Sequence, residues 1–327
     1  MLTPTRERPP SQNTEVVLSG RLLLPKSRKS AVVVSINRPD RLNCFDTEVC
    51  HRLAQIFNDI AEEILQYDLV IKSGNPDGNE DDGGFNSPIA AVIFTGQGPS
   101  FCAGADLSDP PNPLEQSSDL PHYLRLNPTH QMSRIGVPII GALKGHVITG
   151  GFELALGCDI LIGDPTTIFR DTHVKFGLAP CWGLSQKLSQ RISPGRAKII
   201  SFSAKALKAE TAYEWGLLDE LVDESPASLG DEEFECSGGI KVENDDYALL
   251  RALELADMIG CNDSVMVRRY KRAIVEGAHV DFGKGLQRER ELGLAHYLEV
   301  VGDGSTFEGA KVFITDGSRP RTVSSKL

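Results

Sequence analysis

Short apolar runs, most of them without alternation, recur along the first two thirds of the chain and are bounded by turn residues. Runs of this kind are typical of strands that are buried on both faces. The expected strands lie at 15–24, 31–36, 89–95, 138–143, 158–162 and 217–222. Because segments with helical periodicity separate most of them, the pattern predicts an α/β fold with a largely parallel sheet.

Helical periodicity, with apolar residues three and four positions apart, marks the other segments. Helices are expected at 46–66, 122–134, 150–157, 183–191, 195–203, 208–215, 247–260, 264–277 and 282–298. The last three follow one another without a strand between them, so the C-terminal third is predicted to be all helical.

Two polar segments, at 72–88 and 223–246, interrupt this pattern and are predicted to be insertions, the first a mobile loop. The first fourteen residues contain three prolines and few apolar side chains, which is typical of a disordered arm. We divide the chain into an arm at 1–14, a core at 15–262 with both insertions, a helical region at 263–315 and a flexible tail at 316–327.

The composition is that of a soluble globular protein, with 40% hydrophobic and 24% charged residues among 327. A net charge of −11 disfavours nucleic acid as a partner, because phosphate backbones bind basic surfaces. No apolar run reaches the roughly 18 residues that cross a bilayer, so no membrane span is expected. The seven cysteines lack C-x-x-C spacing and mostly lie in apolar runs, which predicts reduced, buried thiols of an intracellular protein.

The last three residues, Ser325-Lys326-Leu327, match the tripeptide that the peroxisomal import receptor recognises at a C-terminus. They follow a polar segment rich in turn residues, which predicts an exposed tail. We therefore expect the protein in peroxisomes, or in a specialised peroxisome such as a glycosome, with the import receptor as a partner.

The segment from Gly141 to Asp159 combines a strand end, a glycine turn and a helix that begins at Gly150. Glu153 falls in the first turn of this helix. Burial raises the pKa of a carboxyl group and the N–H groups of a helix start lower it, so Glu153 is a candidate for proton transfer. The position suits an ordinary glutamate, favoured by the helix dipole, equally well.

A second glycine turn, at 103–106, also follows a buried strand. If the two turns lie side by side, the N–H groups of Ala105 and Gly150 converge on one oxygen, as in an oxyanion hole. Two unrelated tight turns would have the same sequence. The chain contains no phosphate-binding glycine loop and no G-x-S-x-G elbow, and the spacing of His146 and His173 does not suit a metal.

Several motifs in order resemble the crotonase (enoyl-CoA hydratase/isomerase) superfamily, over roughly Val16 to His296. They include Asn37-Arg-Pro-Asp-Arg-Leu-Asn43, Phe101-Cys-Ala-Gly-Ala-Asp106, Pro138-Ile-Ile-Gly-Ala-Leu-Lys-Gly145 and Gly150-Gly-Phe-Glu-Leu-Ala155. The segment from Phe169 to Gln186 resembles a subgroup of peroxisomal enoyl-CoA hydratases.

The resemblance implies a crotonase-type spiral of ββα units with an all-helical C-terminal region, assembled as a homotrimer or homohexamer. It implies an acyl-CoA thioester as ligand, with coenzyme A as part of the substrate and no separate cofactor. The oxyanion donors of the family correspond to the N–H groups of Ala105 and Gly150. The contacts with coenzyme A correspond to Arg41, Leu42, Ala103 and Asp106.

One departure from the family affects the expected chemistry. Hydratases of the family place two glutamates around one water, and the first corresponds to Glu153. Where the second is expected, this chain has Thr172-His173. His173 suits proton transfer by its ordinary pKa, but it also suits a structural role, and Asp171 is a nearby alternative.

Two cysteines are further candidates. Cys181 stands near the position of the acidic partner in dienoyl-CoA isomerases and is not acidic, so that branch is disfavoured. Cys102 is a conceivable thiol nucleophile, but its place in a tight turn after a strand favours packing.

We therefore expect an enzyme of fatty-acid β-oxidation that hydrates 2-enoyl-CoA thioesters, with an enolate stabilised by two N–H donors. The alternatives are an isomerase that uses one carboxylate to convert 3-enoyl-CoA to 2-enoyl-CoA, and an acyl-CoA-binding protein of weak activity. The lone carboxylate Glu153 motivates both alternatives.

Overall fold

A six-stranded sheet forms the centre of the computed structural model, which describes residues 15–72, 88–110, 120–224 and 236–301. In spatial order its strands are β1 (Val17–Leu23), β2 (Ser30–Ile36), β3 (Ile89–Gly96), β4 (Ile139–Leu143), β6 (Ile160–Gly163) and β9 (Glu220–Leu221). The β1–β2 pair is antiparallel and the other pairs are parallel. The predicted α/β class and largely parallel sheet are confirmed.

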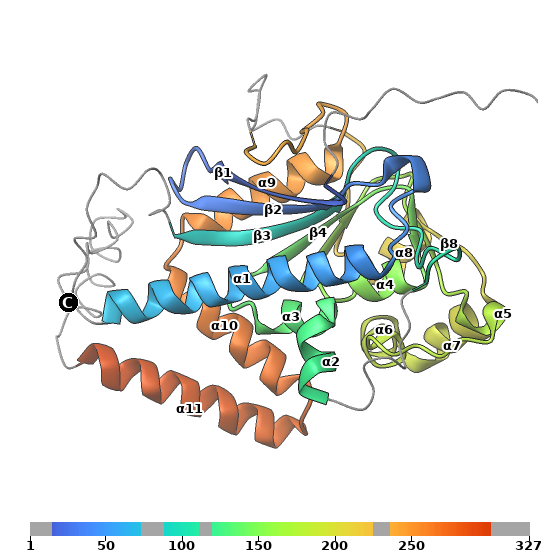
Figure 1. Cartoon of the computed structure of the whole chain (residues 1–327). Coiled ribbons are helices and arrows are strands. Elements are labelled where there is room, and N and C mark those ends of the chain that lie inside the picture. The colour runs from blue at the N-terminus through green and yellow to red at the C-terminus, as the bar shows by residue number, and fades with distance from the viewer. Residues whose placement is uncertain (1–14, 73–87, 111–119, 225–235, 302–327) are drawn as a thin grey trace, which may run out of the picture.

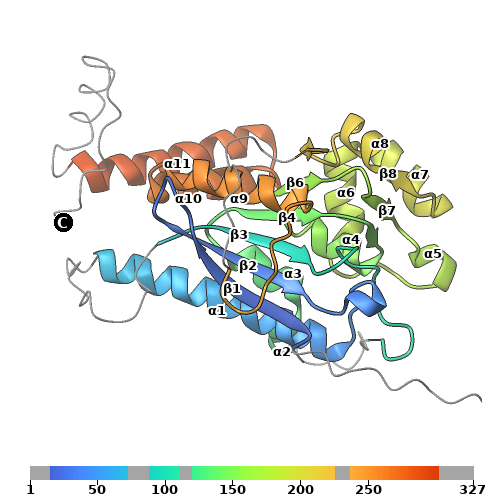
Figure 2. The same ribbon diagram turned by 90° about the horizontal axis from the view of Figure 1, so that it is seen from above.

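Helices cover both faces of this sheet. One face packs against α9 (Tyr247–Gly260) and the other against α1 (Thr47–Lys72) and α3 (Pro128–Arg134), as Figures 1 and 2 show. Along β2, Val33 belongs to the core beneath α9 and Val34 to the core beneath α1. Burial on both faces explains why the strands are continuous apolar runs.

The other helices of the described residues were mostly expected from periodicity. They are α2 (Leu120–Leu126), α4 (Gly150–Ala155), α5 (His173–Phe176), α6 (Leu184–Ile192), α7 (Pro194–Ser203), α8 (Ala209–Glu214), α10 (Ser264–Gly277), α11 (Phe282–Val301) and the 3₁₀ turn η1 (Pro39–Arg41). The all-helical C-terminal region is confirmed. No helix in the described ranges is long and apolar enough to cross a membrane.

A second, three-stranded sheet was not expected from the sequence. Its strands, in the order β5-β7-β8, are β5 (His146–Ile148), β7 (Ile168–Arg170) and β8 (Leu207–Lys208). Strands of two or three residues carry too few side chains for periodicity to reveal them. Its strand β5 lies between β4 and α4 in the chain, so this small sheet positions the glycine turn before Glu153.

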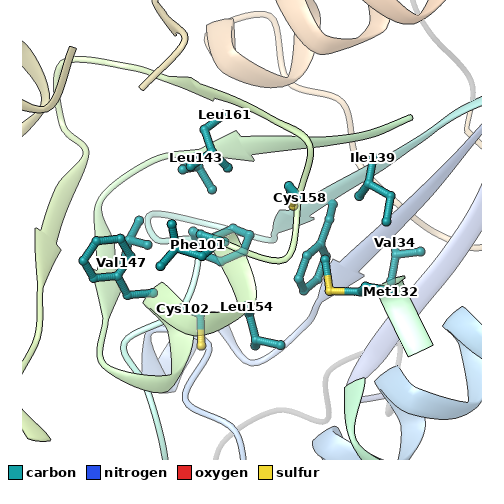
Figure 3. Close-up of a cluster of buried hydrophobic side chains, with 14 of the residues drawn as sticks. Val34, Phe101, Cys102, Met132, Ile139, Leu143, Val147, Leu154, Cys158 and Leu161 are labelled. Atoms are coloured by element: carbon teal, nitrogen blue, oxygen red, sulfur yellow. The ribbon is translucent and has the colours of Figure 1, made fainter. Parts of the chain in front are cut away.

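A buried apolar cluster holds the start of α4 in place. Phe101 and Cys102, which follow β3, pack with Val147 of β5 and Leu154 of α4, and all four are fully buried (Figure 3). Close packing of this kind leaves α4 little freedom to move.

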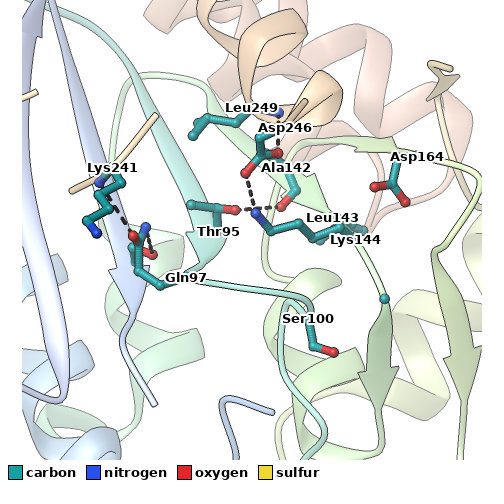
Figure 4. A network of polar contacts seen from close by, with 12 residues as sticks. Thr95, Gln97, Ser100, Ala142, Leu143, Lys144, Asp164, Lys241, Asp246 and Leu249 are labelled. Carbon is teal, nitrogen blue, oxygen red and sulfur yellow. Dashed lines mark hydrogen bonds and ion pairs between the residues drawn. The ribbon is translucent and has the colours of Figure 1, made fainter. Parts of the chain in front are cut away.

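A polar network ties the ends of β3 and β4 to α9 (Figure 4). Lys144 forms an ion pair with Asp246, and Asp246 accepts a hydrogen bond from the Leu249 N–H as the N-cap of α9. Thr95 Oγ1 donates to the Ala142 carbonyl at 3.0 Å. These contacts fix the C-terminal ends of the strands, where the turns of the candidate site begin.

Three sequence expectations need correction. The helix expected at 122–134 is two helices, because Asn127 caps α3 by accepting from the His130 N–H and Pro128 follows it. The thiols of Cys181 and Cys261 are exposed rather than buried, since both lie outside the packed elements. The strand expected at 217–222 has only two residues.

Several predicted segments lie outside the described residues. These are the arm at 1–14, most of the first insertion, part of the second, the end of the helical region at 302–315 and the tail at 316–327. The described end of the second insertion packs against β1, where Ser237 Oγ accepts from the Arg21 N–H at 2.7 Å. Ile240 of the same segment is buried in the core beneath α9.

Candidate active site

The two glycine turns singled out from the sequence lie side by side. The Cys102 N–H donates to the His146 carbonyl at 2.9 Å, and the Ile148 N–H donates to the Cys102 carbonyl at 3.0 Å. A methyl group on Gly104 would lie 2.9 Å from the Ile148 carbonyl oxygen, and one on Gly151 only 2.3 Å from that of Cys102. The turns therefore approach more closely than side chains allow.

The two N–H groups expected as oxyanion donors are not used by this pairing. The Phe45 N–H donates to the Gly104 carbonyl at 2.9 Å, and the Phe45 carbonyl accepts from the Asp106 N–H at 2.7 Å. Pairing through Gly104 and Asp106 turns the Ala105 N–H to the opposite side. The Gly150 N–H is the first of α4 and has no acceptor within the helix. The juxtaposition was predicted, and the role of these donors stays a prediction.

Glu153 is buried, with 3% of its surface exposed. Its Oε1 accepts from the Trp182 N–H at 2.8 Å and from the Leu184 N–H, the first of α6, at 3.3 Å. Burial raises the pKa of this carboxyl group, and it outweighs the two N–H donors and the charge of His173, which lower it. One oxygen is thus anchored, and the other, Oε2, faces His173.

His173 lies opposite Glu153, between two carboxylates. Its Nε2 is 3.7 Å from Glu153 Oε2, and its Nδ1 is 2.7 Å from Asp171 Oδ1. Burial lowers the pKa of His173, but the hydrogen bond with Asp171 and the charges of Glu153 and Asp171 raise it above its ordinary value. The two sequence hypotheses for this position, His173 and Asp171, are therefore parts of one arrangement.

We call residues 102–106 and 148–153 the donor side of the site, and residues 170–173 and 181–184 the histidine side. Thr149 joins them. Its N–H donates to the Arg170 carbonyl at 2.8 Å, and its Oγ1 accepts from the Thr172 N–H at 3.1 Å. The backbone of Thr149 has a φ of 51°, which β-branched residues rarely adopt. These hydrogen bonds hold the strained turn and set the position of His173.

Sequence reasoning gave no role to Thr149, Trp182 or Leu184, because each contributes through its position in the fold. The only local signal is Gly183, whose φ of 104° turns the chain so that the neighbouring N–H groups reach Glu153. Trp182 also stacks on Phe45, with ring centroids 5.3 Å apart, and so links the histidine side to the donor side.

The four residues expected to contact coenzyme A lie on two neighbouring segments, η1 with its C-cap Leu42 and the turn at 103–106. The Ala103 N–H donates to the Leu42 carbonyl at 3.0 Å, and Arg41 Nη1 lies 2.8 Å from Asp106 Oδ2. Hydrogen bonds from Ser108 and from two arginines hold the pKa of Asp106 below its usual range. Asp106 therefore orients arginine side chains, and the half-exposed Arg41 guanidinium remains accessible beside the turn that carries Ala105.

The cysteine alternatives do not fit this site. Cys102 is fully buried, and burial raises the pKa of its thiol to about 12, so it has no nucleophilic thiolate. Its packing role is confirmed. Cys181 is exposed next to Trp182 and supplies no acid–base carboxylate.

Known proteins of one family resemble this chain. Residues 85–248 match the family model described as enoyl-CoA hydratase/isomerase. The chain is 33% identical to the "Probable enoyl-CoA hydratase 1, peroxisomal" of Arabidopsis thaliana, over 96% of this chain and 99% of that protein. It is 29% identical to the short-chain-enoyl-CoA hydratase of Clostridium acetobutylicum, over 83% of this chain and 87% of that protein.

Solved structures show the same fold. The enoyl-CoA hydratase from Bacillus anthracis gives a TM-score of 0.65 at 25% identity, over 93% of this chain and 97% of that one. The fold expected from the sequence motifs is therefore confirmed.

Proposed function

This chain belongs to the enoyl-CoA hydratase/isomerase family, and we propose that it hydrates 2-enoyl-CoA thioesters in fatty-acid β-oxidation. The observation that carries this proposal is the pair of proton-transfer groups on opposite sides of one site, Glu153 and His173, 3.7 Å apart. The backbone N–H groups of Ala105 and Gly150 belong to the two adjacent glycine turns. A hydration needs all of these elements.

The reaction follows from these positions. The thioester carbonyl accepts hydrogen bonds from the Ala105 and Gly150 N–H groups, which stabilise the negative charge that develops as water adds to C3. Loss of one such donor costs about 3–4 kcal/mol of transition-state stabilisation. Glu153 removes a proton from the water, and a second group returns a proton to C2. We assign this second role to His173.

The isomerase alternative is less well supported, because it needs one carboxylate and leaves His173 without a role. The test supplies the purified protein with 2-enoyl-CoA in ¹⁸O-labelled water and, separately, with 3-enoyl-CoA. We expect ¹⁸O in a 3-hydroxyacyl-CoA product. Conversion of 3-enoyl-CoA without any hydration of 2-enoyl-CoA would instead establish the isomerase. Binding of both esters without turnover would establish an acyl-CoA-binding protein.

We further propose that the protein forms a homotrimer or homohexamer. No residue of α10 is buried, although this helix is strongly amphipathic. Ile274 of α10 has 67% of its surface exposed, and Phe282 at the start of α11 has 82% exposed. Apolar faces of this kind mark association surfaces. Light scattering coupled to gel filtration measures the mass, and a monomer would contradict this assembly.

The C-terminal tripeptide supports import into peroxisomes, and the name of the Arabidopsis relative describes that protein as peroxisomal. Fluorescent fusions of the full chain and of a chain without Ser325-Lys326-Leu327 test this proposal. We expect the first to enter peroxisomes and the second to stay outside them.

A further inference from the structure

We propose that Asp171 is a positioning residue that holds His173 as an imidazolium acid, so that the Asp171–His173 pair takes the place of a second catalytic glutamate. The inference rests on the proposed hydration and identifies its second proton-transfer group. Asp171 itself touches neither the substrate nor Glu153, and acts through the ring of His173.

The hydrogen bonds of Asp171 determine how the ring is oriented. Asp171 Oδ1 lies 2.7 Å from His173 Nδ1 and also accepts from the His173 N–H at 3.1 Å. An ionised carboxylate can only accept, so Nδ1 must carry a proton. The other nitrogen, Nε2, is then directed at Glu153 Oε2, 3.7 Å away. Both His173 and Asp171 are buried, so water competes little for these contacts.

The charge of the pair matches that of the group it replaces. In a site with two glutamates, the acid is a neutral carboxyl group with one transferable proton. An imidazolium alone would add a positive charge to a buried site. Together with the Asp171 carboxylate, however, it forms a neutral pair that still has one transferable proton, on Nε2.

The electrostatic surroundings favour this protonation state. Burial raises the pKa of Asp171, but hydrogen bonds from His173 and from Ser201 of α7 lower it below its ordinary value, so Asp171 stays ionised. The pKa of His173 is raised by the two flanking carboxylates. The charge of Glu153 also acts on three other titratable groups near the site, Lys187 of α6, Tyr123 of α2 and Cys181 before α6.

The complete step balances. The water oxygen bonds to C3 while Glu153 takes one water proton, and the C2=C3 π electrons move onto the thioester oxygen as an enolate. The enolate carbon C2 then takes the Nε2 proton of His173, which leaves a neutral imidazole. Proton transfer from Glu153 to Nε2 restores the starting state, so the net change is the addition of one water.

The test compares Asp171→Asn in two backgrounds. In the otherwise unchanged chain, asparagine keeps an acceptor for the His173 N–H but does not stabilise an imidazolium. We expect kcat for hydration to fall by at least about 10²-fold. The alkaline limb of the pH profile should move down by about one pH unit or more, because the acid is lost as pH rises through a lowered pKa.

In a His173→Glu background, a carboxyl group supplies the proton. The Asp171 carboxylate then has no imidazolium to stabilise and only repels the ionised form of that carboxyl group. There, Asp171→Asn should leave kcat unchanged or raise it. An equal loss of kcat in both backgrounds would mean that Asp171 merely supports the fold, and it would overturn the proposal. Thermal unfolding of each variant reports whether the fold is kept.

A second measurement does not need turnover. ¹⁵N NMR of histidine-labelled protein detects protons on both ring nitrogens, and His173→Gln assigns the signal among the seven histidines. We expect a doubly protonated His173 at neutral pH. A neutral ring overturns the proposal for Asp171. A protonated ring in a protein that hydrates no enoyl-CoA rejects the proposed function instead.

Discussion

The donor side and the histidine side of the site face one another but are built in different ways. The donor side presents backbone N–H groups, and its turns pack so closely that a methyl group on Gly151 would meet the Cys102 carbonyl at 2.3 Å. The histidine side presents side chains, and hydrogen bonds to Thr149 hold its backbone. Chemistry can therefore change on the histidine side while the donor side keeps its residues.

Glu153→Gln changes a residue that belongs to the donor side and accepts hydrogen bonds from N–H groups of the histidine side. Among the substitutions discussed, we expect it to reduce kcat most. Glutamine keeps an oxygen for the Trp182 and Leu184 N–H groups, so the fold should be unchanged. It cannot take a proton from water, and we expect kcat for hydration to fall by about 10³- to 10⁴-fold. The decrease in enoyl-thioester absorbance gives the rate.

The circular dichroism spectrum of Glu153→Gln serves as its control and should match that of the parent chain. A variant that retains a tenth of the activity would contradict the role of Glu153. Proton transfer would then have to be carried out by residues of the histidine side alone.

Gly151→Ala tests whether the donor side depends on close backbone packing. The added methyl group meets the backbone of Cys102, which cannot move without disturbing the bridge to β5. Overpacking of this kind costs about 1–3 kcal/mol of folding free energy. Chemical denaturation measures the loss.

Gly195→Ala is a matched control for that substitution. Gly195 lies in α7, and a methyl group there meets nothing within 4 Å. Its unfolding free energy should change little or rise, because alanine favours a helix. Equal destabilisation by both substitutions would mean that the donor side does not depend on close backbone packing.

The same contrast explains what the sequence revealed. The small residues of the donor side could be predicted from the sequence, since Gly150 and Ala105 follow predicted strands. Only the structure shows that they lie side by side. His173 was recognised as a departure and Asp171 as an alternative to it, but their pairing was not predicted, because a hydrogen bond between residues two apart depends on how the chain turns. Short strands such as β7, which carries the histidine side, leave no periodic signal.

Thr149→Val tests the connection between the two sides and should have a smaller effect. Valine is also β-branched, so the strain at φ 51° is kept, but the Thr172 N–H loses its acceptor. An unsatisfied buried N–H costs about 1–3 kcal/mol, and the segment that carries His173 should loosen. We expect kcat to fall by about 10-fold, which corresponds to about 1.4 kcal/mol.

Thr149→Ser keeps the hydroxyl group and should retain most of the activity. If serine and valine reduce kcat equally, the hydroxyl does not position the histidine side. The shape of the threonine side chain would then account for the loss.

Arg41→Ala addresses the outer edge of the donor side and should have the smallest effect. The Arg41 side chain is 52% exposed, and its ion pair with Asp106 lies at 2.8 Å. Exposed ion pairs contribute at most about 1 kcal/mol, so the KM for an acyl-CoA should rise only about 3- to 5-fold, with kcat unchanged. Because salt screens exposed charges, the difference from the parent chain should shrink as ionic strength rises.

Arg272→Ala, which removes a similarly exposed arginine paired with Glu276 on α10, should leave KM unchanged. A loss of kcat in Arg41→Ala would instead mean that this edge helps to position Ala105, and that the donor side extends further than its two turns.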